Sequence, residues 1–299
     1  MPEIISCNCV PPVKKYEYGS SQPVDPGDTR TEITYREYYQ DQTISEMELP
    51  VCIKIGEEAF RESSIKEIIV PECITIEDGA FRSSTLAAGD FSSVTTIGDY
   101  SFYNCDSVYA DTVLEFPSIK EIGAHAFDSA GVNNGAYINF FNVETLGEKA
   151  FYNSYYLKNI GDTLNLPNCK TINKQALAGY ASVDGFYASY IYLPSIVSIG
   201  EQAFRGIVPS NRHFEMHIGP NCTSIGDNIL FFGTVYDALV RDFYIEAINP
   251  PALASPFETS VGSPYWYPTH VYVPSQSVNT YKEHPNWAWC ADYITAMPT

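Results

Sequence analysis

The nine-residue phrase CIKIGEEAF at residues 52–60 decides the fold, because the chain repeats it. Seven further copies follow, and successive copies start 21 to 27 residues apart. They are CITIEDGAF at 73, VTTIGDYSF at 94, IKEIGAHAF at 119, VETLGEKAF at 143, CKTINKQAL at 169, IVSIGEQAF at 196 and CTSIGDNIL at 222. Such even spacing indicates that one structural unit is stacked along the chain.

The columns of the phrase indicate which side chains are buried. The fourth position is Ile in seven copies and Leu146 in one, as expected of an inward-facing residue. The fifth is Gly in six copies, and we expect a turn there that uses the positive φ that Gly tolerates. From Gly to the final Phe the phrase suits one helical or 3₁₀ turn. The Phe residues should form one buried ladder: Phe60, Phe81, Phe102, Phe127, Phe151 and Phe204.

A second signal precedes most copies, in which apolar residues alternate and end in Pro. The examples are MELP at 47–50, IIVP at 68–71, LEFP at 114–117, LNLP at 164–167 and IYLP at 191–194. This pattern predicts a short strand. Each unit is then strand, corner, second extended piece, short helical turn and return loop. One unit cannot bury its own apolar face, so the units stack into a solenoid.

We therefore predict a β-rich α/β fold, a leucine-rich-repeat solenoid of about eight coils with a C-terminal cap. The solenoid proper should span residues 46–233. Residues 1–45 form an N-terminal segment in which TEITYREYY at 31–39 adds a capping strand. Residues 234–299 form the last coil and the cap, because the end of a solenoid must cover an apolar face.

The phrases IGEEAFRES and IGAHAFDSA, with the strand-Pro element, resemble the BspA-like leucine-rich repeats of bacterial surface proteins. The ending is similar too, with INPPAL at 248–253 and HVYVPSQSVNTYKEHPNW at 270–287. The resemblance covers residues 46–299. It implies a surface binding or adhesion protein, outside the cell or on its surface, with a protein or glycan partner. The alternative is a structural or assembly component, such as part of a phage particle or surface fibre.

Composition narrows the classes of partner. The chain has 299 residues and a net charge of −19, which argues against nucleic acids and anionic membrane surfaces. No run of 18 apolar residues exists, so no membrane span is expected. The N-terminus MPEIISCNCVPP lacks the basic and apolar regions of a signal peptide, so none is expected in this chain.

The stretch RHFEMHIGPNC at 212–222 contains the residue types of a zinc site. On a strand, however, residues i and i+2 lie about 6.7 Å apart on one face, which separates His213 and His217 by about 13 Å. One zinc with bonds near 2.0 Å cannot join them, so we expect a surface row and no metal. Cys222 belongs to the first column, as do Cys52, Cys73 and Cys169, and these should be buried like apolar residues.

The remaining cysteines and turn-like motifs carry less information. Cys105 should also be a core residue, whereas a metal or disulfide role for Cys7, Cys9 and Cys290 is open. DPGDT at 25–29 lacks the residue order of a calcium loop and predicts an ordinary turn. The sequence has no G-x-S-x-G, no phosphate-binding loop and no dinucleotide-binding motif. We therefore expect a protein that is not an enzyme and uses no cofactor.

The outward positions of the predicted strands differ between the two halves of the chain. The first half is acidic, with Glu46, Glu48, Glu67, Asp90 and Glu115, and the second is aromatic. Aromatic rings with polar tips are favoured in recognition surfaces. The predicted binding surface consists of Tyr137, Tyr190, Tyr192, His217, His270 and Tyr272. The alternative is that these rings only form cross-strand pairs on a solvated sheet.

Overall fold

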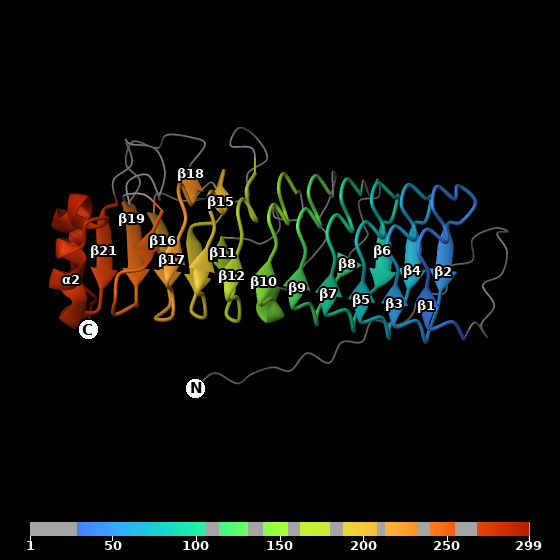
Figure 1. The fold of residues 1–299 in the computed structure, drawn as a ribbon, viewed down its shortest axis with the longest axis horizontal. Helices are drawn as coiled ribbons and strands as arrows, with labels where there is room; N and C mark the ends of the chain where they lie inside the picture. The colour runs from blue at the N-terminus through green and yellow to red at the C-terminus, as the bar shows by residue number, and fades with distance from the viewer. Residues whose placement is uncertain are drawn as a thin grey trace.

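The structure is a computed structural model. It describes residues 29–105, 114–130, 140–154, 162–179, 188–207, 213–231, 240–254 and 268–298. Short parallel strands stack along one axis, from β1 and β2 at one end to helix α2 at the other (Figure 1). The predicted leucine-rich-repeat solenoid is therefore confirmed.

One side of the solenoid is a ten-stranded parallel sheet in the described part of the chain. Its strands, in spatial order, are β1 Glu32–Ile33, β3 Lys54–Ile55, β5 Thr75–Ile76, β7 Thr96–Ile97, β9 Glu121–Ile122, β10 Thr145–Leu146, β12 Thr171–Ile172, β14 Ser198–Ile199, β17 Ser224–Ile225 and β20 Ala252–Leu253. Each of the eight phrases supplies one strand of this sheet, from β3 through β17 in the order above. The register pairs each fourth-position residue with the fourth-position residue of the next coil, as in Ile55 with Ile76. β1 comes from the stretch expected to add a strand, and β20 extends the sheet at the other end.

The strand-Pro elements form the opposite side, again with parallel pairing. The N-terminal strands are β2 Glu46–Glu48, β4 Glu67–Ile69, β6 Ala88–Asp90 and β8 Leu114–Glu115. The C-terminal strands are β11 Thr163–Asn165, β13 Tyr190–Leu193, β16 His213–Ile218, β19 Val240–Ile245, β21 His270–Val273 and β22 Ile294–Ala296. A 3₁₀ turn, η1, spans Phe140–Asn142, and a smaller sheet pairs β15 Phe204–Arg205 with β18 Leu230–Phe231.

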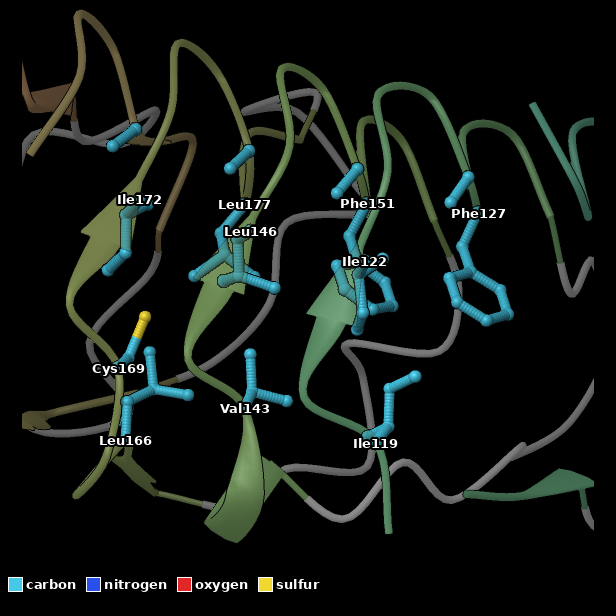
Figure 2. Packing of buried hydrophobic residues seen from close by; sticks show 14 of the residues in the cluster. Ile119, Ile122, Phe127, Val143, Leu146, Phe151, Leu166, Cys169, Ile172 and Leu177 are labelled. Atoms are coloured by element: carbon cyan, nitrogen blue, oxygen red, sulfur yellow. The ribbon is translucent and has the colours of Figure 1, made fainter. Parts of the chain in front are cut away.

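The predicted Phe ladder is confirmed. Phe60, Phe81, Phe102, Phe127 and Phe151 are stacked in sequence, with ring centroids 4.9 to 5.2 Å apart. Leu177 takes the next position and Phe204 follows, and all are fully buried. Tyr38 of the N-terminal segment adds a ring beyond Phe60, at 5.1 Å. Figure 2 shows the same interior filled by Ile122, Leu146 and Ile172 beside Phe127, Phe151 and Leu177.

The segment from Gly to Phe differs from the expected helical or 3₁₀ turn. It is a run of tight turns, in which Ala59 N–H bonds to Gly56 O and Arg61 N–H to Glu58 O. The intervening amides bond to the next coil, as Phe60 N–H does to Ala80 O. Alternate amides therefore tie each coil to its neighbour along this third side too, which a helical turn could not do because its amides bond within the turn.

The expected left-handed turn at the fifth position is also wrong, because positive φ occurs two residues later and, in most coils, again four residues after that, as at Glu62 and Ser83. The seventh-position residues have φ between 49° and 62°. They are Glu58, Gly79, Tyr100, His125, Lys149, Gln175, Gln202 and Asn228. The fifth-position Gly serves close approach instead, since a Cβ on Gly123 would lie 2.6 Å from the carbonyl carbon of Gly98 in the previous coil.

The cysteines of the phrase are core residues, as predicted. Cys52, Cys73, Cys169 and Cys222 are buried free thiols, and Cys105 is also fully buried. Burial raises the pKa of Cys73, Cys169 and Cys222 to about 12. Cys290 is likewise a free, buried thiol whose pKa burial raises to about 12, while Cys7 and Cys9 lie outside the described residues.

The C-terminal end of the solenoid is covered by short helices. These are η3 Ser275–Ser277, α2 Val278–Glu283 and η4 Ala288–Tyr293. Tyr281 and Trp287 are fully buried, and each anchors the cover to the last coils. The Tyr281 hydroxyl donates to Ala247 O at 2.8 Å, and Trp287 Nε1–H donates to Pro251 O at 3.3 Å.

Candidate binding face

The C-terminal strands β11 to β22 present two rows of side chains to solvent. In β16, Phe214, Met216 and Ile218 are buried while His213, Glu215 and His217 are part-exposed, as the alternation predicts. The parallel register then aligns equivalent residues across strands. One row, here called the aromatic row, is Tyr192, His217, Tyr244 and Tyr272. The other, called the mixed row, is Tyr190, Glu215, Asp242 and His270.

The aromatic row is a continuous stack of rings. The ring centroids are 4.6 Å apart for Tyr192 and His217, 4.3 Å for His217 and Tyr244, and 4.7 Å for Tyr244 and Tyr272. The ring planes are within 25° of each other. Neighbouring rings therefore cover both faces of the two inner rings, His217 and Tyr244. Partly exposed rings of this kind present their edges and polar tips to a ligand.

The mixed row is held by hydrogen bonds between histidines and carboxylates. Asp242, only 7% exposed, accepts from His213 Nε2 at 3.1 Å and from His270 Nδ1 at 2.8 Å. His217 Nε2 donates to Glu215 Oε1. These bonds hold Glu215, Asp242 and His270 of the mixed row and His217 of the aromatic row, so these side chains are pre-organised.

Besides burial, the carboxylates of Glu215 and Asp242 help to raise the pKa of nearby tyrosines. Burial is the first cause that raises the pKa of Tyr192, Tyr244 and Tyr272, and the negative charge of Glu215 is a further one for all three. Asp242 adds to the effect at Tyr244 and Tyr272. The phenol groups therefore remain protonated donors at neutral pH.

An open groove of about 600 Å³ runs beside the aromatic row. Its walls include Tyr192, His217, Thr163 and Asn165, and Glu246 also lines it. Pro167, Pro194 and Gly219 line it too, and they are the residues two positions after Asn165, Tyr192 and His217. The volume lies within the range of about 300–1,000 Å³ that small-ligand sites occupy.

Five of the six residues of the predicted binding surface lie on this face. Tyr190, Tyr192 and Tyr272 are partly buried, as is His217, while His270 is exposed. Tyr137 lies outside the described residues. The cross-strand pairing weighed as the alternative also occurs, since four rings stack on each other.

Sequence reasoning missed Tyr244 and Asp242, which complete the two rows. Both lie on β19, whose coil has lost the Ile-Gly phrase and continues as INPPAL. A signal was nevertheless present, because Phe243 and Ile245 alternate with Tyr244 as in the other strands. The missed residues matter, since His217 and Tyr272 are joined only through Tyr244.

The N-terminal strands carry carboxylates at the equivalent positions. Glu46, Glu48, Glu67 and Asp90 are exposed. Partial desolvation by neighbouring atoms, followed by the charge of Glu46, raises the pKa of Glu67. The open face is thus acidic at one end and aromatic at the other.

Two further grooves follow the glycine corner of the ten-stranded sheet. Their carboxylates serve the backbone, since Asp78 Oδ1 accepts from Asp99 N–H at 2.8 Å and Asp99 Oδ1 from Ala124 N–H at 2.7 Å. These groups are engaged in joining coils. Among the described residues, no cluster of three His, Cys, Asp or Glu side chains could hold a metal ion, and no helix is long and apolar enough to span a membrane.

Comparison with known proteins identifies the repeat. The family model described as the BspA type leucine rich repeat region matches six copies within residues 31–158. Among solved structures, the pneumococcal vaccine antigen PcpA is 18% identical, with 92% of this chain and 73% of that chain covered and a TM-score of 0.42. A leucine rich cell surface protein from Faecalibacterium prausnitzii A2-165 is 13% identical, with 90% and 77% covered and a TM-score of 0.22. No curated protein matches the chain.

Six matched copies within residues 31–158 agree with the strand β1 and the five phrases that begin between 52 and 143. The later phrases keep the same register, as β12, β14 and β17 continue the ten-stranded sheet. Residues 31–158 are therefore similar to the BspA type leucine rich repeat region, and strands β12, β14 and β17 continue the same stacking beyond them.

Proposed function

We propose that this chain is a non-enzymatic binding protein that acts outside the cell or on a bacterial cell surface. Its ligand, a protein or a glycan, is held on the face formed by strands β11, β13, β16, β19, β21 and β22. The repeat type supports this class, because solenoids present long open faces to extended partners.

The observation that carries the proposal is the pair of rows on β13, β16, β19 and β21. Tyrosine and histidine present large amphipathic surfaces and lose little side-chain entropy on binding, which is why such rings dominate recognition surfaces. Here stacking and the Asp242 hydrogen bonds already hold the rings in place. A ligand therefore avoids most of the ordering cost that a mobile surface would impose.

Charge limits the partners. The net charge of −19 and the exposed carboxylates of the N-terminal strands disfavour anionic ligands and favour neutral or basic ones. This electrostatic preference should weaken as salt is added.

The test is an array of glycans and host proteins probed with the purified chain and with Tyr190→Ala/Tyr192→Ala. We expect a ligand whose binding the double variant loses. The matched control is Glu48→Ala/Asp90→Ala, which changes outward positions of β2 and β6 on the same side and should bind the ligand normally. A ligand bound equally well by a folded Tyr190→Ala/Tyr192→Ala variant would place the binding surface elsewhere.

A further inference from the structure

We propose that the groove beside Tyr192 is a subsite for a neutral pyranose ring, which stacks on the free face of Tyr192. This inference rests on the proposed function, because it names the ligand class for the same face.

The first step concerns the end of the aromatic row. His217 covers one face of Tyr192, with ring centroids 4.6 Å apart and planes within 18°. On the other side the register partner of Tyr192 is Asn165 on β11, which has no ring. The groove lies against this side, since Thr163, Asn165 and Pro167 line it together with Tyr192. Among the described strands, the stack of rings therefore ends at Tyr192 on β13, although β11 lies beyond it in the sheet.

The spacing fits one more ring. Adjacent strands lie about 4.8 Å apart, and the rings of the row are 4.3 to 4.7 Å apart. A ring placed above Asn165 would therefore meet Tyr192 at the distance that the other members of the row already keep. Tyr272, at the opposite end of the row, has a different neighbour, Thr295 of β22.

The polar groups of the groove favour a sugar over an aromatic side chain. The C–H groups on one face of a pyranose are weakly positive and pack on the negative face of a Tyr ring. Its hydroxyls can both donate and accept, which suits the Thr163 hydroxyl, the Asn165 amide and the Glu246 carboxylate along the groove. A phenyl ring would stack equally well but could not form hydrogen bonds with these groups.

The extent of the groove allows a chain of sugars rather than a single ring. Its lining residues come from four successive coils, since Pro167, Pro194, Gly219 and Glu246 follow strands β11, β13, β16 and β19. An oligosaccharide could therefore continue along the solenoid axis.

Charge selects neutral sugars. None of the described residues that line the groove is Lys or Arg, and Glu246 adds a negative charge. Glu215 is close enough to help raise the pKa of Tyr192. Sialic and uronic acids would meet repulsion here without a cation to offset it.

The test uses immobilised neutral oligosaccharides and their sialylated counterparts, with each neutral hit titrated to obtain a Kd. Asn165→Tyr should fill the groove with an added ring and weaken binding about tenfold or more, as should Tyr192→Ala. The matched control is Glu48→Ala/Asp90→Ala on the N-terminal strands β2 and β6, which should change Kd by less than about twofold. Asn165 is exposed, so Asn165→Tyr should fold even if Tyr192→Ala does not.

Three outcomes would overturn the inference. They are no binding to any neutral oligosaccharide, preferred binding of sialylated forms, or a neutral hit whose Kd is unchanged in folded Asn165→Tyr. A protein ligand lost in Tyr190→Ala/Tyr192→Ala but kept in Asn165→Tyr would leave the proposed function standing and remove the sugar subsite. A ligand unaffected by either variant would overturn both.

Discussion

At the residue scale, the fifth and the seventh positions of the repeat each constrain the backbone. The fifth-position Gly lies against the previous coil, where even a Cβ would overlap backbone atoms. The seventh position has a left-handed backbone, which costs most L-residues about 1–2 kcal/mol. The repeat tolerates this cost at Tyr100, His125 and Lys149 because the amide of each residue donates a hydrogen bond to a carbonyl group of the next coil.

These two constraints predict that a Gly→Ala substitution lowers the free energy of unfolding by different amounts at the fifth and the seventh positions. Gly123→Ala should destabilise by roughly 3 kcal/mol, because its Cβ would lie 2.6 Å from Asp99 Oδ1 and from Gly98 C. Gly79→Ala should cost about 1–2 kcal/mol, because φ is +62° but the nearest atom, Glu58 Cγ, is 3.3 Å away and belongs to a flexible chain. Urea unfolding of the two variants would measure both, and equal or reversed costs would contradict this assignment.

The sequence predicted the buried columns but not the left-handed one. The fourth and first columns are chemically uniform, since burial accepts only apolar or thiol side chains there. The seventh column holds Glu58, Tyr100 and Gln175, which look like any exposed position. Only Gly79 and Asn228 indicated positive φ in that column. A backbone conformation imposed by stacking leaves little trace in composition.

At the element scale, the Phe ladder is the main link between coils. Phe81 is fully buried, stacks on Phe60 and Phe102 at 5.2 Å each, and meets the edge of Phe91. Phe81→Ala should cost about 3–5 kcal/mol, because it opens a cavity in the middle of the row. Chemical denaturation followed by circular dichroism would measure this loss.

Phe141 provides the matched control for this substitution. Its side chain is 57% exposed, so Phe141→Ala should cost less than about 1 kcal/mol. A similar loss of stability in the two variants would mean that the ladder is not what holds the coils together.

The aromatic row was predictable as a set of residues but not as a stack. Alternation along β13, β16 and β21 identifies Tyr192, His217 and Tyr272 as outward-facing. Whether neighbouring rings share faces depends on the register between strands, which sequence periodicity does not specify. The consequence is large for function, because the stack hides the inner faces and leaves the Tyr192 end as the place for another ring.

At the scale of the whole molecule, the two ends differ in chemistry. Each coil contacts only its neighbours, so stability is close to a sum of local terms and unfolding can begin at either end. The Phe ladder is continuous from Phe60 to Phe151, in the first half. Tyrosines whose pKa is raised gather in the second half, at Tyr192, Tyr244, Tyr272 and Tyr281.

Alkaline pH should therefore unfold the C-terminal end first. Burial raises the pKa of these four tyrosines, so the unfolded chain loses its phenol protons first, near pH 10. Their contribution to stability is complete below about pH 10 and is lost as pH rises further. Buried thiols act in the same direction, from about pH 8.5, and three of them, Cys169, Cys222 and Cys290, lie in the second half.

Hydrogen exchange with mass spectrometry, corrected for intrinsic rates, would follow both ends between about pH 9 and about pH 11. Amides of β19, β21 and α2 should lose protection before those of β3, β5 and β7. Tyr281→Phe removes the most strongly buried phenol of the set, so it should move the loss at the C-terminal end to higher pH, although it also removes the hydrogen bond to Ala247 O. Simultaneous loss of amide protection at both ends would show that the solenoid unfolds as one cooperative unit. Earlier loss of protection at the N-terminal end would show that carboxylate repulsion there outweighs tyrosine ionisation.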